Sequence, residues 1–256
     1  MRIIGFILGL ILVLACPSLS VAGKPASLDD GRRLYEANCA ICHGTRGDGH
    51  GEAAARFATP PRDFTKGVYK FRSTGSGQPP TDEDLIRTVT RGTPGTAMVP
   101  QDYLSAEDVR SVIAYIKSLT PKFADPSSMR LVPIPPPPEK NKATITAGRK
   151  VYEKAGCTEC HGTKARGDGP SSTKLAVRPA DLTRRPLKSG QAAQDIVRTL
   201  LTGLDGTSMP SYHLALADDE IWKLAYYIDS LGGPPQLTKD ERLGQEIVRQ
   251  RAKEKR

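Results

Sequence analysis

The motif Cys-x-x-Cys-His occurs twice in the 256-residue chain, as CAICH at residues 39–43 and as CTECH at residues 157–161. The sequence around each motif also recurs: GRRLYE (31–36) matches GRKVYE (148–153), PRDFT (61–65) matches PADLT (179–183), and GTAM (95–98) matches GTSM (206–209). The aspartate of PRDFT and that of PADLT each lie 20 residues after the histidine of the preceding Cys-x-x-Cys-His motif. Two copies of about 95 residues are too few and too long for a solenoid, so the chain is a duplicated domain.

The segment between the copies is rich in proline, with four consecutive prolines at residues 135–138. Such a run favours an extended polyproline II conformation and acts as a semi-rigid spacer. We therefore expect a first domain at residues 26–120, a proline-rich linker at 121–142, a second domain at 143–233 and a charged tail at 234–256. From residue 237 onward the tail has seven Lys or Arg against four acids. We expect it to be a solvated, frayed end, with docking to a partner or to anionic lipid as the alternative.

The patterning inside each copy predicts helices joined by Gly- and Pro-rich loops, with no alternating stretch long enough to be a convincing strand. Thr81 and Ser105 stand where helix N-caps are expected, each followed by acidic residues that favour the helix dipole. Asp218 is expected to cap the matching helix of the second copy. The expected fold class is all-α, with two tandem domains joined by the proline-rich linker.

The N-terminal residues 1–22 have the pattern of an export signal. Arg2 precedes an apolar run of about a dozen residues, which is short for a membrane span. Cleavage after Ala22 is the first expectation. The alternative is a lipoprotein signal ending before Cys16, which would become the acylated N-terminus and a membrane anchor. A third hypothesis is that the segment stays uncleaved and anchors the protein. All three export the protein, so we expect a periplasmic location, possible membrane anchoring through Cys16, and no nucleic-acid partner.

After removal of Cys16, all four remaining cysteines belong to the two Cys-x-x-Cys-His motifs. That motif is the signature of covalent haem c attachment, because each thiol can add to one haem vinyl group while the next residue presents an imidazole to the iron. A shared tetrahedral zinc or two disulfides are the alternatives, but neither needs a histidine after each second cysteine. The sequence therefore predicts two covalently bound haem c groups.

The second axial ligand decides what such a haem can do, since methionine supports electron transfer and an open position allows oxygen or peroxide chemistry. Met98 and Met209 occupy equivalent positions, 55 residues after His43 and 48 residues after His161. A thioether is soft and polarizable, which suits ferrous iron. His50 and His213 have no counterpart in the other copy, and we interpret both as surface or loop histidines, although His213 could replace Met209 as a ligand.

These motifs make the chain similar to di-haem class I cytochromes c, in which two mono-haem domains are fused. The resemblance covers residues 31–119 and 148–231. It implies Cys39, Cys42, His43 and Met98 at the first haem and Cys157, Cys160, His161 and Met209 at the second. It also implies packing of Tyr35 on Tyr115 and of Tyr152 on Tyr227 where two helices cross, and places Pro61 and Pro179 near the proximal histidines.

The expected function is a relay of single electrons between redox partners of a bacterial respiratory chain, without enzymatic activity of its own. No acid, base or nucleophile suited to catalysis recurs around the motifs, and Asp48 and Asp168 lie in Gly-Asp-Gly turns. The formal charge of +9 would attract an acidic partner. A di-haem enzyme, such as a peroxidase or a sulfur-compound dehydrogenase, is the alternative. Aromatic residues make up only 5% of the chain, so each core is expected to form around its haem.

Overall fold

The structure is a computed structural model and describes residues 27–254. The expected signal segment, including Cys16, lies outside the described residues. Within residues 27–254 the regular elements are helices, and β-pairing is confined to isolated bridges, which confirms the all-α prediction. Domain 1 contains α1 (Leu28–Asn38), α2 (Ala40–His43), η1 (Ala54–Arg56), α3 (Asp82–Arg91) and α4 (Ala106–Ser118). Domain 2 contains α5 (Lys142–Lys154), α6 (Cys157–His161), η4 (Ser172–Lys174), α7 (Ala193–Thr202) and α8 (Asp218–Ser230).

The helix starts follow the predicted caps with one difference. The side chains of Thr81 and Ser105 accept hydrogen bonds from the amides of Asp84 and Asp108, completing capping boxes at α3 and α4. Helix α8 begins at Asp218, so this residue is its first helical position and not its cap. The amide of the preceding residue donates instead to the Glu220 carboxylate at 3.1 Å.

Each domain is organised around one crossing of its first and last helices, α1 on α4 and α5 on α8. The contact centres on a glycine that each copy of the repeat carries at its start. A Cβ atom at Gly31 would lie 2.0 Å from the Ser111 carbonyl oxygen, and one at Gly148 would lie 1.9 Å from the Lys223 carbonyl oxygen. Only glycine allows the two backbones to approach this closely.

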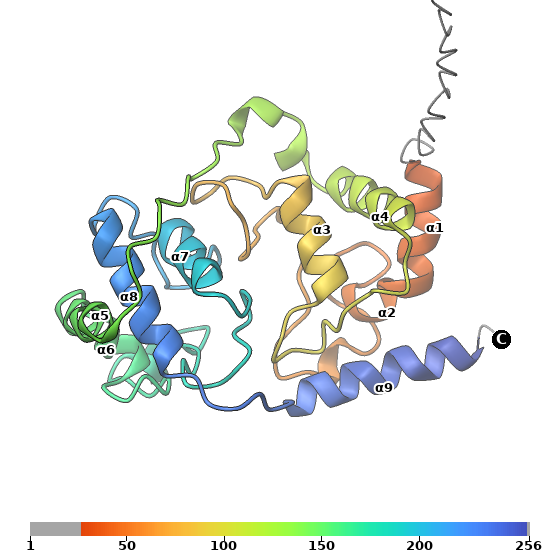
Figure 1. Cartoon of the computed structure of the whole chain (residues 1–256). Coiled ribbons are helices and arrows are strands. Elements are labelled where there is room, and N and C mark those ends of the chain that lie inside the picture. The colour runs from red at the N-terminus through yellow and green to blue at the C-terminus, as the bar shows by residue number, and fades with distance from the viewer. Residues whose placement is uncertain (1–26, 255–256) are drawn as a thin grey trace, which may run out of the picture.

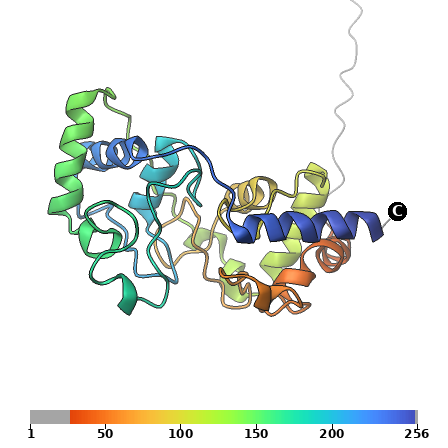
Figure 2. The ribbon, with the colours of Figure 1, turned by 90° about the horizontal axis from the view of Figure 1, so that it is seen from below.

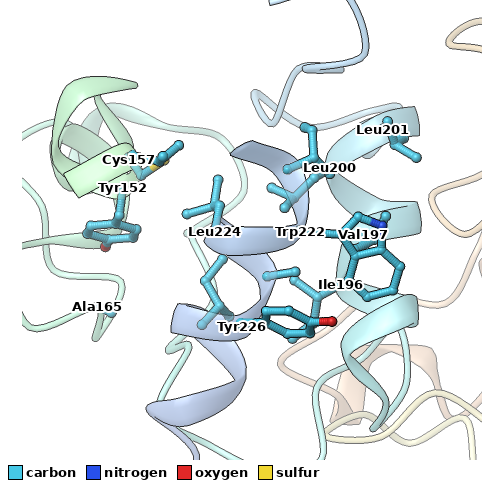
Figure 3. Packing of buried hydrophobic residues seen from close by; sticks show 14 residues of the cluster. Tyr152, Cys157, Ala165, Ile196, Val197, Leu200, Leu201, Trp222, Leu224 and Tyr226 are labelled. Atoms are coloured by element: carbon cyan, nitrogen blue, oxygen red, sulfur yellow. The ribbon is translucent and has the colours of Figure 1, made fainter. Parts of the chain in front are cut away.

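The predicted aromatic pairs flank these crossings. The ring centroids of Tyr35 and Tyr115 are 5.1 Å apart, and those of Tyr152 and Tyr227 are 5.5 Å apart. The buried cluster of domain 2 is drawn in Figure 3, where Tyr152 and Cys157 lie on one side of α8 and Val197, Leu200 and Leu201 of α7 lie on the other. The domain 2 core is therefore held by three layers of helix, with α8 in the middle.

The two domains are held together by polar contacts as well as by the chain. The fully buried guanidinium of Arg72 donates to the Thr202 carbonyl oxygen at 2.6 Å and to the Asp205 carboxylate at 2.8 Å. Asp205 also accepts from Ser76 and from the Gly77 amide, each at 2.8 Å. A buried cation with its partner across the interface fixes the relative position of the loops that carry it.

The linker crosses from domain 1 to domain 2 with two short 3-10 turns, η2 (Pro121–Phe123) and η3 (Pro126–Ser128), followed by an extended proline run. The run packs on α8: the Trp222 indole donates to the Pro135 carbonyl oxygen and the Tyr226 hydroxyl to that of Pro138, both at 2.8 Å. The spacer is thus docked on domain 2 along its second half.

The C-terminal segment differs most from the sequence-based expectation. Instead of a frayed end, it forms helix α9 (Lys239–Glu254), which leaves domain 2 and runs back along domain 1, as Figures 1 and 2 show. Ile247 is buried and packs with Ala53 and Phe57 of domain 1. The apolar residues Leu243, Ile247 and Val248 can form one side of a short helix, but such a short pattern favours a helix only where a partner surface covers it.

Within the described residues, 27–254, no helix combines the length and the hydrophobicity that a transmembrane span requires.

Candidate haem sites

Domain 1 encloses a cavity of 530 Å³ that brings together the four residues predicted for the first haem. Cys39, Cys42 and His43 line it from the α1–α2 region, and Met98 lines it from the loop before α4. The volume lies in the usual range for a buried cofactor site. The donor set also fits, because two thiols, an imidazole and a thioether face one largely apolar space, as a covalently bound haem c requires.

The histidine of each motif is oriented by a backbone carbonyl. His43 Nδ1 lies 3.0 Å from the Arg62 carbonyl oxygen, and His161 Nδ1 lies 3.0 Å from that of Ala180. A carbonyl accepts only, so Nδ1 carries the proton and Nε2 is left for the metal. Both carbonyls belong to the residue after the prolines singled out in the sequence. Burial lowers the pKa of both histidines, which keeps the rings in the neutral form that binds iron.

Tyr35 and Tyr152, which pack at the helix crossings, also form hydrogen bonds through their hydroxyl groups. The Tyr35 hydroxyl donates to the Gly44 carbonyl oxygen at 2.8 Å, and the Tyr152 hydroxyl donates to that of Gly162 at 2.7 Å. Each bond joins the first helix of a domain to the residue directly after its Cys-x-x-Cys-His motif. The start of the fold and the haem-binding turn are therefore fixed to each other in the same way in both copies.

The two methionine loops also share one construction. The Met98 amide donates to the Thr96 hydroxyl at 3.1 Å, and the Met209 amide donates to the Thr207 hydroxyl at 3.1 Å. Both threonine hydroxyls donate in turn to a carbonyl oxygen three residues earlier. These bonds close the Gly-Thr-x-Met turn locally, so each methionine reaches its position on a constrained loop.

Helix α9 forms part of the wall of the domain 1 cavity. Its first turn accepts three backbone amides of domain 1: those of Ala58 and Thr59 donate to Asp240, and that of Gly95 donates to Glu241 at 2.7 Å. In its middle, a Cβ at Gly244 would lie 2.4 Å from the Ala97 carbonyl oxygen, next to Met98. Near its end, the Arg251 guanidinium donates to the Ala37 carbonyl oxygen at 2.8 Å.

The predicted site of domain 2 is more open. Cys157 is buried, and burial raises the pKa of its thiol to about 11. Met209 packs against the same apolar cluster as Cys157, whereas His161 is partly exposed. Apart from bonds within the C-terminal segment, the hydrogen bonds of α9 to described residues go to domain 1, and Leu214, five residues after Met209, is 95% exposed. The first haem site is therefore covered from a direction in which the second has no helix of this kind.

The remaining polar residues singled out in the sequence lie outside the cavity. His50 and His213 are exposed, as expected for surface histidines. Asp48 accepts a hydrogen bond from the His50 amide at 3.1 Å, which is the arrangement of a turn-forming aspartate. Among the cavity-lining residues that sequence reasoning missed are Arg62, Tyr69, Lys70 and, from domain 2, Lys188. The available signal was the spacing of the two lysines, each 27 residues after its motif histidine.

The fold and the two sites define the class of the protein: a tandem pair of helical domains, each built around a Cys-x-x-Cys-His turn for covalent haem. The cytochrome c family model matches residues 28–120 and 145–232, and the chain belongs to this family. Two such domains mean two covalently bound haem c groups.

Individual proteins extend this comparison. The chain is 30% identical over 214 residues to the Cbb3-type cytochrome c oxidase subunit CcoP of Azospirillum sp. (strain B510), covering 79% of this chain and 62% of the relative. It is 30% identical to the CcoP subunit of Azospirillum brasilense, covering 79% and 61%. The chain thus spans about three fifths of the length of these curated relatives. A chain of the Kuenenia stuttgartiensis reducing HAO-like protein complex Kustc0457/Kustc0458 is 40% identical with a TM-score of 0.77, over 80% of this chain and 96% of that one.

Proposed function

We propose that the protein is an exported di-haem electron carrier, which accepts single electrons at one domain and delivers them from the other. Haem c supplies an iron that alternates between ferrous and ferric states. The observation that carries the proposal is the presence of Met98 in the same cavity as His43. A Met98 thioether bound to the iron would leave no room for a substrate at the metal, and this favours electron transfer over catalysis.

We assign the same ligand set to both domains. His43 and Met98 would hold the first iron, and His161 and Met209 the second. Thioether bonds would form at Cys39 and Cys42 in domain 1 and at Cys157 and Cys160 in domain 2. The support is the repeated local construction: the carbonyl at each Nδ1, the tyrosine at each turn and the threonine at each methionine loop.

The difference between the two domains indicates which of them a redox partner contacts. Helix α9 already occupies one face of the domain 1 cavity, whereas in domain 2 His161 is partly exposed and Leu214, five residues after Met209, is 95% exposed. We propose that a redox protein docks on domain 2, and that the formal charge of +9 steers an acidic partner. The names of the similar proteins, an oxidase subunit and a member of a reducing HAO-like complex, support a place within a larger redox assembly of a respiratory chain.

We also propose a periplasmic location, because covalent haem attachment in bacteria takes place outside the cytoplasm and residues 1–22 have the pattern of an export signal. Acylation at Cys16 would add a membrane anchor. Mass spectrometry of the secreted protein tests both points at once, since it reports the cleavage site, the acyl chain and the number of haems.

The test of the relay is the ferric absorption spectrum. We expect a methionine-to-iron charge-transfer band from both haems, half of it lost in Met98→Leu and the other half in Met209→Leu. Met129→Leu, directly after the linker turn η3, is the matched control and should keep the full band. A high-spin haem that binds cyanide in the resting protein would overturn the relay and support a di-haem oxidoreductase instead. A low-spin spectrum retained by Met209→Leu would assign the ligand to His213.

A further inference from the structure

The domain 1 cavity contains a buried hydroxyl without a partner. The Tyr69 side chain is only 7% exposed and lines the cavity, and its hydroxyl makes no hydrogen bond to any described residue. Buried hydroxyls are nearly always hydrogen-bonded, because leaving one unpaired loses its interactions with water. The hydroxyl therefore points to a polar group of the molecule that fills this cavity.

Four cationic side chains line the same cavity. Arg251 donates to the Ala37 carbonyl oxygen, whereas Arg62, Lys70 and Lys188 make no ion pair or side-chain hydrogen bond with a described residue. Burial, together with the charges of Arg62 and Lys188, lowers the pKa of Lys70 to about 8. Neighbouring cations repel one another, and an anion among them would reduce that cost. The side chains that line this part of the cavity thus suit a carboxylate ligand.

Helix α9 shows where the cations lie relative to the cysteines. Its first turn, at Asp240 and Glu241, lies beside Lys188, because the Gly95 amide donates to Glu241 and a Cβ at Gly95 would lie 4.0 Å from Lys188 Cε. Its last turn lies beside the cysteines, because Arg251 donates to the Ala37 carbonyl oxygen, two residues before Cys39. From Asp240 to Arg251 the helix rises about 16 Å. A haem attached to Cys39 and Cys42 would be bound through its vinyl groups, and the propionate groups on its other side would then be available to Arg62, Lys70 and Lys188.

We propose that four side chains bind the propionate carboxylates of the first haem: Arg62, Tyr69, Lys70 and Lys188. Domain 2 thus completes the haem site of domain 1 through Lys188. This inference rests on the proposed attachment of that haem at Cys39 and Cys42. Lys188 occupies the same repeat position as Lys70, but the counterparts of Arg62 and Tyr69 in domain 2 are Ala180 and Leu187. The second haem therefore lacks most of this set.

The consequence is a link between domain docking and electron affinity. A cation beside the propionates compensates their negative charge and disfavours the additional positive charge of ferric iron. Lys188 thus raises the reduction potential of the first haem only while domain 2 is held against domain 1 by contacts such as that of Arg72 with Asp205. Domain 2 would tune the first haem without contributing a ligand to its iron.

The experiment compares Lys188→Gln with Lys174→Gln, an exposed lysine of domain 2 that does not line the cavity. Both haem potentials are resolved by spectroelectrochemical titration of the full chain, and the first haem is assigned as the one altered by Met98→Leu. We expect Lys188→Gln to lower the potential of the first haem and to shift its propionate-bending bands in resonance Raman spectra. Lys188→Arg should retain the wild-type potential, and Tyr69→Phe should shift the same Raman bands.

Three results would overturn the proposal. The first is a potential of the first haem that Lys188→Gln changes no more than Lys174→Gln does. The second is a shift confined to the potential of the second haem, which would show that Lys188 acts on the haem of its own domain. The third is an equal shift in Lys188→Arg, which would indicate a structural effect without a charge effect. Absence of the methionine charge-transfer band from the wild-type spectrum would contradict the proposed relay. The propionate-bending bands would still test the contact of Lys188 with the first haem.

Discussion

The two domains share their construction but not their surroundings. In both, a glycine allows the first and last helices to touch, a tyrosine joins the first helix to the Cys-x-x-Cys-His turn, and a carbonyl orients the histidine. Domain 1 also receives α9 and Lys188 from the other half of the chain, and His43 is 9% exposed, whereas His161 is open to partial contact with solvent. The two copies therefore share the local structure around the Cys-x-x-Cys-His motif, and they differ because α9 and Lys188 contact only the first site.

Removing the cysteines should have the largest effect on each domain. In Cys39→Ala/Cys42→Ala we expect half of the haem to be lost, together with much of the helicity of domain 1, because a cavity of 530 Å³ with three unpaired cations would remain. Cys157→Ala/Cys160→Ala should also lose half of the haem. Haem per chain, from absorption and mass, and far-UV circular dichroism provide the measurement. Two haems retained in either variant would contradict the assignment.

The helix crossings should respond equally in the two domains. Gly31→Ala and Gly148→Ala each place a Cβ about 2 Å from a backbone oxygen, so the helices must separate, at a cost of roughly 1–3 kcal/mol or more in the free energy of unfolding. Gly75→Ala is the control, since its nearest neighbour would be 3.6 Å away. Thermal or denaturant unfolding of the holoprotein measures the change. A neutral result in one domain alone would show that its crossing is less constrained than the geometry indicates.

Loosening α9 should distinguish the domains. Ile247→Ala removes a buried contact with Ala53 and Phe57 and should weaken the docking of α9 by roughly 2–4 kcal/mol. We expect faster binding of cyanide or faster oxidation by a small reagent at the first haem, with the second haem unchanged. The exposed Gln250→Ala on the same helix is the control. Equal acceleration at both haems would mean that α9 does not cover the first one selectively.

The smallest expected effect is again symmetrical. Tyr35→Phe and Tyr152→Phe keep the ring but lose the hydrogen bond to Gly44 and Gly162, leaving a carbonyl oxygen unpaired, at a cost of about 1–2 kcal/mol. Unfolding of the holoprotein and the haem spectra report the change. The potentials should stay near their wild-type values, because neither hydroxyl bonds to the motif histidine. A large loss in only one domain would show that the shared bond has different importance in the two copies.

The local features of the fold were predictable because each depends on neighbours in sequence. The caps at Thr81 and Ser105 need residues three positions ahead, and the methionine turns close within five residues. The helix cap at Asp218 was misplaced by one residue, since a carboxylate two positions later, at Glu220, accepts the amide instead. Boundaries of this kind depend on small differences between competing local bonds.

The sequence alone determined the duplication, the helical class and the residues suited to two covalent haems, because a motif with fixed spacing defines its own chemistry. Only the tertiary structure decided that the charged tail is a helix on the first haem site and that Lys188 faces the other domain. An amphipathic segment such as 239–254 is marginal as a helix in water, and its partner surface lies about 140 or more residues earlier in the chain, beyond the reach of any local pattern. Contacts between such distant segments arise only from packing.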